Sequence, residues 1–455
     1  MRRAIRDPES WTTSTELIVE LDGRDETTKS ARLRGALRDS IRSGRLEPGR
    51  RLPSSRALAA DLGVSRGLVV ETYEQLVAEG YLVAAHGSGT TVAHNAAEPS
   101  HRPTRPTDTA EWRVDFGPGT PDLASFPRSS WAAAVRTALR DLPDVDLAYR
   151  DPRGDDILRT ELSAYLRRVR GAETDPSRLF IVAGFTHGLS LVARALVEAG
   201  TTHLAVEDPG AYVQRTAMID AGLRVEPLPV DRDGALTDEL AASRVGAAMV
   251  TPAHQYPMGG VLGPERRSKL LEWARSRPGR VVIEDDYDAE FRYDRSPVGT
   301  MHGLAPEHVV LGGSVSKSLA PALRMGWIAV PSAMAPVIEE LQQVSYAYPS
   351  TIDQRALAIL LASGRYDRHI RRARATYRTR RDVLVEGLSD VPGVVIGGIA
   401  AGLHLSIELP HHVDESAITV DLSARGVCAW GLDNYRIRPG QPGLLLGYAH
   451  LTLDQ

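Results

Sequence analysis

Apolar residues recur at helical spacing near the start of the chain. Residues 30–42 carry apolar side chains on one face and arginines outside it, a pattern that predicts an amphipathic helix. A second, shorter helix is predicted after Pro53, with Ser54 or Ser55 as its N-terminal cap.

A third helix is predicted to begin at Ser65 as its cap and to stop at Gly80. Two short β-like runs follow, and Gly87 and Gly89 lie in the turn between them. Three helices with a tight turn between the second and third, followed by a hairpin, predict a winged helix-turn-helix.

A different pattern begins near Val114, where short apolar runs alternate with helical stretches. This alternation predicts an α/β domain with a mostly parallel sheet and helices on both faces. In such sheets ligands bind at the carboxyl ends of the strands. The runs read as strands are residues 179–183, 203–206, 247–250, 281–284 and 309–312.

The two patterns are separated by a polar segment with several prolines and no apolar periodicity, residues 94–112. Such a composition is typical of a semi-extended linker without a core of its own. The sequence therefore predicts three parts: a DNA-binding domain over residues 1–93, the linker, and a large domain over residues 113–455.

Composition narrows the functional classes. At 455 residues the chain is too long for one core, and its net charge of −4 means that nucleic acid would have to bind a local patch. Residues 30–93 supply one, with nine arginines against six acidic residues. The one cysteine, Cys428, excludes a disulfide framework within the chain. No apolar run reaches membrane-spanning length and the N-terminus lacks a signal-peptide core, so we expect a cytosolic protein without membrane contact.

Lysine is rare in this chain, which uses arginine for nearly all of its positive charge. Only Lys29, Lys269 and Lys317 occur. A lysine amine can lose its proton and attack a carbonyl, whereas arginine stays charged. Because Ser314, Ser316 and Arg324 surround Lys317, this stretch suits a cofactor that carries an aldehyde and a phosphate. Taken alone, the stretch is equally consistent with a solvated surface lysine.

Polar residues follow the other predicted strands at their carboxyl ends. Each has an ordinary structural alternative: a simple turn, a buried aromatic or a solvated loop. Together they form an ordered series of phosphate turn, aromatic ring, polar turn, and carboxylate with tyrosine. The residues concerned are Gly184, Phe185 and Thr186 at the start of a helix, Tyr212, His254, and Asp285 with Tyr287.

The segment from Ser43 to Arg66 closely resembles the GntR-type DNA-binding domain. In that fold the third helix lies in the major groove with its N-terminal residues at the base edges. The resemblance implies operator DNA as a partner. The residues expected at bases are Ser65, Arg66 and Thr72; those expected on the phosphates are Arg50, Arg51, Ser54 and Arg56; and Gly87 and Gly89 form the tip of the wing.

From residue 114 onward the ordered series resembles fold-type I enzymes of the aminotransferase superfamily, which use pyridoxal 5′-phosphate (PLP). The resemblance implies large and small subdomains and a Schiff base between PLP and Lys317. It also implies roles for the other residues. Asp285 would pair with the ring nitrogen, Tyr287 with the ring oxygen, and Tyr212 would stack on the ring near His254; Ser314, Ser316, Arg324, Gly184, Phe185 and Thr186 would hold the phosphate. The choice of Asp285 over Glu284 and Asp286 rests on motif register.

The two domains read together resemble the MocR-type regulators of the GntR superfamily. That resemblance implies a homodimer, with each winged helix crossing to the partner's PLP domain, and a ligand that is PLP or an amino compound. One departure matters: Leu445 stands where aminotransferases carry the arginine that binds the substrate carboxylate, and Arg436 and Arg438 are the candidate substitutes. His187 stands where relatives often have glutamine. Sensing is therefore favoured over turnover, and a working aminotransferase with an accessory DNA-binding domain is the alternative.

Overall fold

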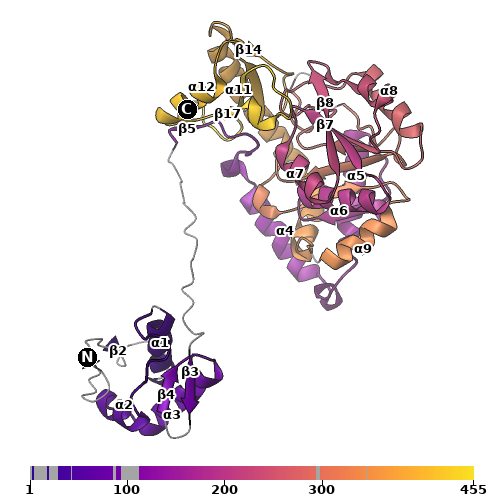
Figure 1. The fold of residues 1–455 in the computed structure, drawn as a ribbon. Helices are drawn as coiled ribbons and strands as arrows, with labels where there is room; N and C mark the ends of the chain where they lie inside the picture. The colour runs from indigo at the N-terminus through magenta and orange to yellow at the C-terminus, as the bar shows by residue number, and fades with distance from the viewer. Residues whose placement is uncertain are drawn as a thin grey trace. The chain divides into compact units, whose positions relative to one another are not determined.

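The structure is a computed structural model of the 455-residue chain. It describes residues 3–4, 18–19, 29–42, 44–85, 89–93, 112–293, 298–345 and 347–455. Internal contacts divide the chain into two compact units, Met1–Thr109 and Ala110–Gln455. The two units are drawn together in Figure 1 and are described separately below.

In its described residues the smaller unit has three helices, a β3–β4 hairpin and a short antiparallel pair of strands, β1 and β2. Its helices are capped as short helices in water must be: the Ser54 hydroxyl accepts a hydrogen bond from the Ala57 N–H, and the Ser65 hydroxyl accepts one from the Leu68 N–H. Gly63 ends the second helix in the left-handed region that favours glycine, at φ 65°. The elements are β1 (Arg3–Ala4), β2 (Ile18–Val19), α1 (Lys29–Arg42), α2 (Ser55–Leu62), α3 (Arg66–Ala78), β3 (Leu82–Ala85) and β4 (Gly89–Val92).

The larger unit is organised around a sheet that contains eight strands in the described part of the chain. The strand order is β6-β13-β12-β11-β10-β7-β8-β9, in which β12, β11, β10, β7 and β8 run parallel. β13 lies antiparallel between β12 and β6. The strands are β6 (Leu179–Val182), β7 (His203–Asp208), β8 (Arg224–Asp231), β9 (Gly234–Ala235), β10 (Ala247–Val250), β11 (Val281–Asp285), β12 (Val309–Ser314) and β13 (Gly326–Ala329).

Helices cover both faces of this sheet, because its strands alternate apolar side chains to either side. One face packs against α6 (Phe185–Glu198), α7 (Tyr212–Asp220) and α9 (Ala335–Ser345). The other packs against α8 (Pro264–Arg275) at β7, β10 and β11 and against α5 (Asp156–Arg170) and α10 (Thr351–Ala362) at β6 and β13. Figure 1 shows α6 and α7 beside β7 and β8. The sheet is thus buried, and its carboxyl-end loops are left to form a site.

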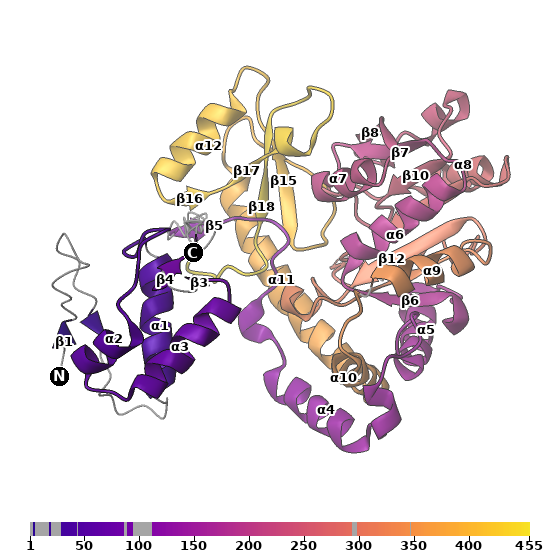
Figure 2. The same ribbon diagram turned by 60° about the horizontal axis from the view of Figure 1, so that its bottom comes forward.

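A second sheet lies in the C-terminal part of the unit, in the order β14-β15-β18-β17. The long helix α11 runs from α10 toward it, as Figure 2 shows. The strands of this second sheet are β14 (Val395–Ile396), β15 (His404–Glu408), β17 (Trp430–Gly431) and β18 (Gly443–Gly447). The strands β5 (Val114–Asp115) and β16 (Val427–Cys428) form a separate pair. The remaining helices of the unit are α4 (Arg128–Asp141), α11 (Arg365–Ser389) and α12 (Glu415–Ala424). Short 3₁₀ turns are η1 (Leu123–Ser125), η2 (Asp144–Leu147), η3 (Pro176–Arg178), η4 (Thr237–Ala242), η5 (Pro321–Leu323) and η6 (Leu432–Tyr435).

The predicted fold class is confirmed: a winged helix-turn-helix precedes an α/β unit with a mostly parallel sheet. The five predicted strands correspond to β6, β7, β10, β11 and β12. The pattern did not predict β8 or the antiparallel β13.

Candidate functional site

A cavity of about 580 Å³ opens at the carboxyl ends of the central strands. Its wall combines residues from the sheet, from α7 and from the second sheet, so that chemistry-bearing side chains distant in sequence meet there. The lining residues used below are Gly119, Tyr212, Tyr256, Asp285, Tyr287, Lys317, His404, Trp430 and Tyr435.

Lys317 lies in the turn that follows β12 and lines this cavity. Its Nζ donates a hydrogen bond to the Gly119 carbonyl oxygen at 2.6 Å. Burial lowers the pKa of the Lys317 amine, and the carboxylates of Asp288 and Asp285 oppose that shift. A side chain at Gly119 would meet the Lys317 Nζ at 2.7 Å, so this glycine keeps the approach to the amine open. The Lys317 amine therefore faces the cavity in surroundings that favour its neutral form more than water does.

Asp285, the last residue of β11, faces the same cavity and is 4% exposed. Its Oδ1 has no hydrogen-bond partner among the described residues. Burial raises the pKa of Asp285 well above its usual range, and the neighbouring Asp286 and Asp288 add to the shift. Buried polar atoms are rarely left unpaired, so this carboxyl group fits a bound group that brings a ring nitrogen to it.

The carboxylates of Glu284 and Asp286, on either side of Asp285, form hydrogen bonds away from the cavity. Both Glu284 oxygens accept main-chain N–H groups at 3.0 Å, and Asp286 forms a two-bond pair with Arg170 at 2.7 Å. Of the three consecutive carboxylates, Asp285 alone lines the cavity. Asp285 is thus, of the three, the carboxyl group that faces the cavity, in agreement with the choice made from motif register.

Tyr287 belongs to a hydrogen-bonded cluster behind the cavity wall. Its hydroxyl lies 2.9 Å from the His254 Nδ1, which lies 2.8 Å from the Asp288 Oδ2. Tyr287 lines the cavity, whereas His254 is not among its lining residues. His254 therefore lies one residue behind the cavity wall, in contact with Tyr287.

The predicted phosphate residues gather at a separate corner. Gly184, at φ 90°, opens α6, and Arg324 donates from its Nη2 to the Ala183 carbonyl at 3.0 Å. A Cβ on Gly184 would lie 3.7 Å from the Arg324 guanidinium, which places the two together. Arg324 itself has φ 47°, a left-handed conformation that non-glycine residues rarely adopt and that clusters at functional sites.

Ser314, Ser316 and Thr186, also predicted to hold the phosphate, differ in their burial. The Ser314 hydroxyl accepts a hydrogen bond from the Ser316 N–H at 3.4 Å, and both serines are half-buried. Thr186 is exposed in the first turn of α6, where helix N–H groups can hold a phosphate. The Phe185 ring lies so close to β12 that a Cβ on Gly312 would approach it to 2.0 Å. Phe185 contributes its main chain to the corner and its ring to the core.

The residues therefore fit PLP. An amine of lowered pKa, an unpaired buried carboxyl group and a helix N-terminus with an arginine lie around neighbouring strand ends. Tyr212, predicted to stack on the ring, is the first residue of α7, is 39% exposed and lines the cavity.

Several lining residues escaped sequence reasoning. Tyr256, Tyr435 and Trp430 make an aromatic wall, with the Tyr256 and Tyr435 rings 5.5 Å apart. His404 is 2% exposed, lies 5.1 Å from the Tyr256 ring and has an Nε2 without a partner in the described structure. Tyr256 had one usable signal, an aromatic side chain directly before Pro257 in a polar loop, whereas His404 lies between two leucines and had none.

The candidate substitutes for the missing arginine do not reach the cavity. Arg436 donates to the Gln441 carbonyl within its own loop, and Arg438 is exposed. Neither is among the lining residues, and none of the described lining residues is an arginine. Leu445, on β18, is fully buried against Leu432 and Tyr435.

In the smaller unit, the arginines predicted to contact DNA at Arg51, Arg56 and Arg66 are exposed, but Thr72 is not. Arg66 is exposed at the start of α3, and Arg51 and Arg56 are exposed nearby. Thr72 was expected to face DNA and does not, since it is fully buried and its hydroxyl donates to the Leu68 carbonyl at 2.8 Å. Thr72 lies on the face of α3 that packs against the core, and this position buries its side chain although threonine is polar.

The other residues predicted to contact DNA are two helix caps, one arginine and the glycines of the wing. Ser54 and Ser65 cap helices and are exposed, and Arg50 is half-buried. Gly89 begins β4 at φ 87°, and a Cβ there would lie 2.9 Å from the Arg51 Nε. Gly87 lies outside the described residues.

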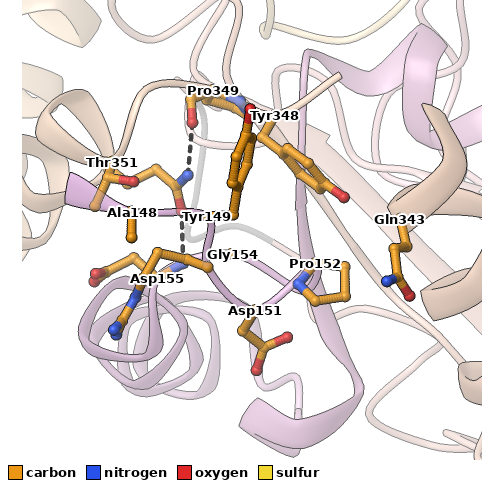
Figure 3. Close-up of a pocket in the computed structure, with 12 residues that line it drawn as sticks. Ala148, Tyr149, Asp151, Pro152, Gly154, Asp155, Gln343, Tyr348, Pro349 and Thr351 are labelled. Carbon is orange, nitrogen blue, oxygen red and sulfur yellow. Dashed lines mark hydrogen bonds between the residues drawn. The ribbon is translucent and has the colours of Figure 1, made fainter. Parts of the chain in front are cut away.

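A second cavity, of about 510 Å³, lies beside η2 and α10 (Figure 3). Gln354 organises it, accepting from the Asp155 N–H at 2.7 Å and donating to the Pro349 carbonyl at 2.8 Å. Tyr149 and Tyr348 both line it, and Tyr149 is 96% exposed.

None of the described helices is long and apolar enough to cross a membrane.

Comparisons with known proteins agree with both units. Residues 29–92 match the bacterial regulatory proteins of the gntR family, and residues 114–430 match the aminotransferase class I and II family. An archaeal alanine:glyoxylate aminotransferase has a TM-score of 0.69 at 24% identity, covering 75% of this chain and 87% of its own. A kynurenine aminotransferase of Pyrococcus horikoshii, solved with PMP, gives 0.69 at 22% identity, with coverage of 75% and 87%. These likenesses show the fold.

Two relatives cover nearly the whole chain. The HTH-type pyridoxine biosynthesis transcriptional regulator of Corynebacterium glutamicum is 33% identical over 92% of this chain and 91% of its own. The probable rhizopine catabolism regulatory protein MocR of Rhizobium meliloti is 33% identical over 95% and 92%. The chain therefore belongs to the MocR-type regulators of the GntR family, in which a winged helix-turn-helix precedes an aminotransferase class I and II domain whose cofactor is PLP.

Proposed function

We propose that this protein is a transcriptional regulator that binds operator DNA through residues 1–93 and senses PLP or an amino compound through residues 113–455, with residues 94–112 as the linker. The observation that carries sensing over turnover is Leu445. Where an aminotransferase needs a guanidinium for the substrate carboxylate, this chain has a leucine buried against Leu432 and Tyr435. Such a regulator works on chromosomal DNA, so we place it in the bacterial cytoplasm.

The pocket residues divide the work on a bound ligand. PLP, when bound, supplies an aldehyde that captures amines and a ring that withdraws electrons. Lys317 offers a neutral amine more readily than an ordinary lysine because burial lowers its pKa. Asp285, whose Oδ1 has no partner among the described residues, would pair with the ring nitrogen. The aromatic wall excludes water from the amine.

A turnover assay separates the regulator from its alternative, a working aminotransferase. We expect no sustained conversion of amino acids with 2-oxoglutarate by the holoprotein, because none of the described residues that line the cavity carries a guanidinium for their carboxylates. Multiple turnovers with any common amino acid would make the enzyme interpretation correct, whatever the DNA-binding unit does.

Replacing Arg66 tests the DNA-binding part. A guanidinium at the start of the recognition helix can pair with a guanine edge. We expect Arg66→Ala to weaken operator binding by about 1–3 kcal/mol and to relax sequence preference at one position. The measurement is fluorescence anisotropy with DNA from immediately upstream of the gene.

Arg56→Ala is the matched comparison, since Arg56 is equally exposed but assigned to phosphate. It should weaken binding to all sequences alike and reduce the salt dependence. Unchanged affinity and preference in Arg66→Ala would refute the base-reading role of Arg66.

We further propose that the protein is a homodimer in which Tyr149 enters the partner's cofactor site. In the described structure Tyr149 lies beside another cavity and not the one containing Lys317. Val145 and Leu147 in the same segment are 67% and 66% exposed. A partner surface would bury this apolar segment.

Sedimentation velocity tests the dimer. We expect a dimer for the native chain and a shift toward monomer for Leu147→Asp, because a carboxylate would be buried in the interface. Val420→Asp, at a similarly exposed valine on α12, should stay dimeric. A native monomer, or equal behaviour of the two variants, would contradict the proposed interface.

A further inference from the structure

A third cavity, of about 270 Å³, lies between α11 and the segment that leads into α4, away from the cofactor pocket. Its α11 side carries arginines, and its opposite side carries small hydroxyl groups. The lining residues are Asp122, Ser125, Pro127, Ser129, Ser130, Arg365, Arg368, His369, Arg372, Ala373, Thr376 and Tyr377.

The three lining arginines are not neutralised by the protein. Arg365, Arg368 and Arg372 have no carboxylate within ion-pair distance among the described residues. Arg380 on the same helix, by contrast, pairs with Asp122 at 2.9 Å. The spacing of the three lining arginines by three and four residues places them on one face of α11, the face that lines the cavity. Three exposed guanidinium groups on one helix face repel one another, and an anion bound between them would relieve that repulsion.

The carboxylates nearest to this cavity are already paired. Asp122 lines it, but its Oδ2 accepts from Arg380 at 2.9 Å and its Oδ1 accepts the N–H groups of Ala124 and Ser125. Asp367, also on α11, pairs with Arg168 at 2.9 Å. The net charge offered to a ligand is therefore positive.

The opposite wall supplies hydrogen-bond donors of the kind that bind phosphate. α4 is 14 residues long, and no side chain caps its N-terminus. Its first turn contributes Ser129 and Ser130 to the cavity. Uncapped N–H groups and the positive end of a helix dipole favour an anion, and guanidinium groups bind its oxygens in pairs.

Two short connections link this cavity to the cofactor lysine. The His369 imidazole, which lines the cavity and is 8% exposed, donates from Nε2 to the carbonyl of Ser318, the residue after Lys317. Asp122 lies three residues from Gly119, whose carbonyl accepts from the Lys317 Nζ. A ligand here would act on both segments that hold the lysine.

We propose that this cavity is a second binding site, for a small molecule that carries a phosphate group, and that its occupancy is felt at Lys317. The cavity is recessed between two walls and lies on the PLP-binding unit, which favours a compact phosphate monoester over a stretch of DNA backbone. This site is independent of the phosphate corner formed by Arg324 and the α6 N-terminus, and its existence does not depend on the proposed regulation.

Calorimetric titration of the PLP-loaded full-length protein with inorganic phosphate tests the site. With PLP bound, the corner at Arg324 is filled, so added phosphate reports on other sites. We expect saturable binding that the double variant Arg368→Ala, Arg372→Ala weakens by about tenfold or more, since charge-assisted hydrogen bonds are lost. Arg371→Ala is the matched control, because Arg371 is exposed on the same helix but does not line the cavity.

A second readout is the visible absorption of the bound PLP, which phosphate should perturb in the native protein and not in the double variant. Three results would overturn the proposal. These are no saturable binding, equal loss in Arg371→Ala, or loss in Arg324→Ala with binding kept in the double variant. If instead the double variant binds phosphate normally and loses affinity for an operator-free DNA duplex, this face contacts DNA and the small-molecule site does not exist.

Discussion

Lys317→Ala is expected to leave a protein that no longer retains PLP. The amine is the group in the cavity that can bond covalently to the cofactor aldehyde, and alanine has no nitrogen to replace it. Native protein purified with PLP should keep its visible absorption through gel filtration and dialysis, and the variant should lose it. The fold should survive, since shortening a half-buried side chain at the cavity wall leaves the core intact.

Lys269→Ala is the matched control for that experiment. Lys269 is a half-buried lysine on α8 that pairs with Asp238 and Glu265 and does not line the cofactor cavity. Its loss should leave the spectrum unchanged. Equal absorption in Lys317→Ala and native protein after dialysis would show that the covalent site lies elsewhere.

Arg170→Ala should destabilise the larger unit severely. The Arg170 side chain is 1% exposed, holds Asp286 through two bonds of 2.7 Å and also donates to the Val298 carbonyl. Removing one partner of a buried pair leaves an uncompensated charge, which costs about 3–5 kcal/mol. The measurement is the urea midpoint of unfolding, followed by fluorescence of the tryptophans in the larger unit.

The same substitution should also disturb the cofactor site. Asp286 adjoins Asp285, and already contributes to the raised pKa of Asp285. Arg140→Ala removes a guanidinium from a fully exposed pair with Asp141 and should leave the midpoint unchanged. A midpoint shift of similar size in both variants would show that the buried pair carries no special share of stability.

Much of the fold could be predicted because local and global signals agree. Ser54 and Ser65 cap the helices that follow them, as their spacing from the apolar residues predicts. The five apolar runs became strands because a buried parallel strand must be apolar on both faces. Asp285 was singled out from three acidic residues by motif register, and the hydrogen bonds of Glu284 and Asp286 now supply a physical reason for it.

The features that could not be predicted depend on tertiary contacts, which local sequence patterns do not indicate. Thr72 lies on the inward face of α3, and its hydroxyl donates a hydrogen bond to the Leu68 carbonyl of the same helix, so it does not face DNA. β13 inserts antiparallel between β12 and β6, a pairing set by the turn around Arg324 and not by its four residues. His404 reaches the cavity from the second sheet, 87 residues after Lys317 in sequence, so no spacing rule connects the two.

The central claim is that a ligand-binding event at Lys317 controls the affinity of the winged helix for DNA. Fluorescence anisotropy with the DNA upstream of the gene tests it, in native protein and in Lys317→Ala, with and without added PLP. We predict that PLP changes the dissociation constant of the native protein and leaves that of Lys317→Ala unchanged. An equal response to PLP in both proteins, or none in either, would contradict the account.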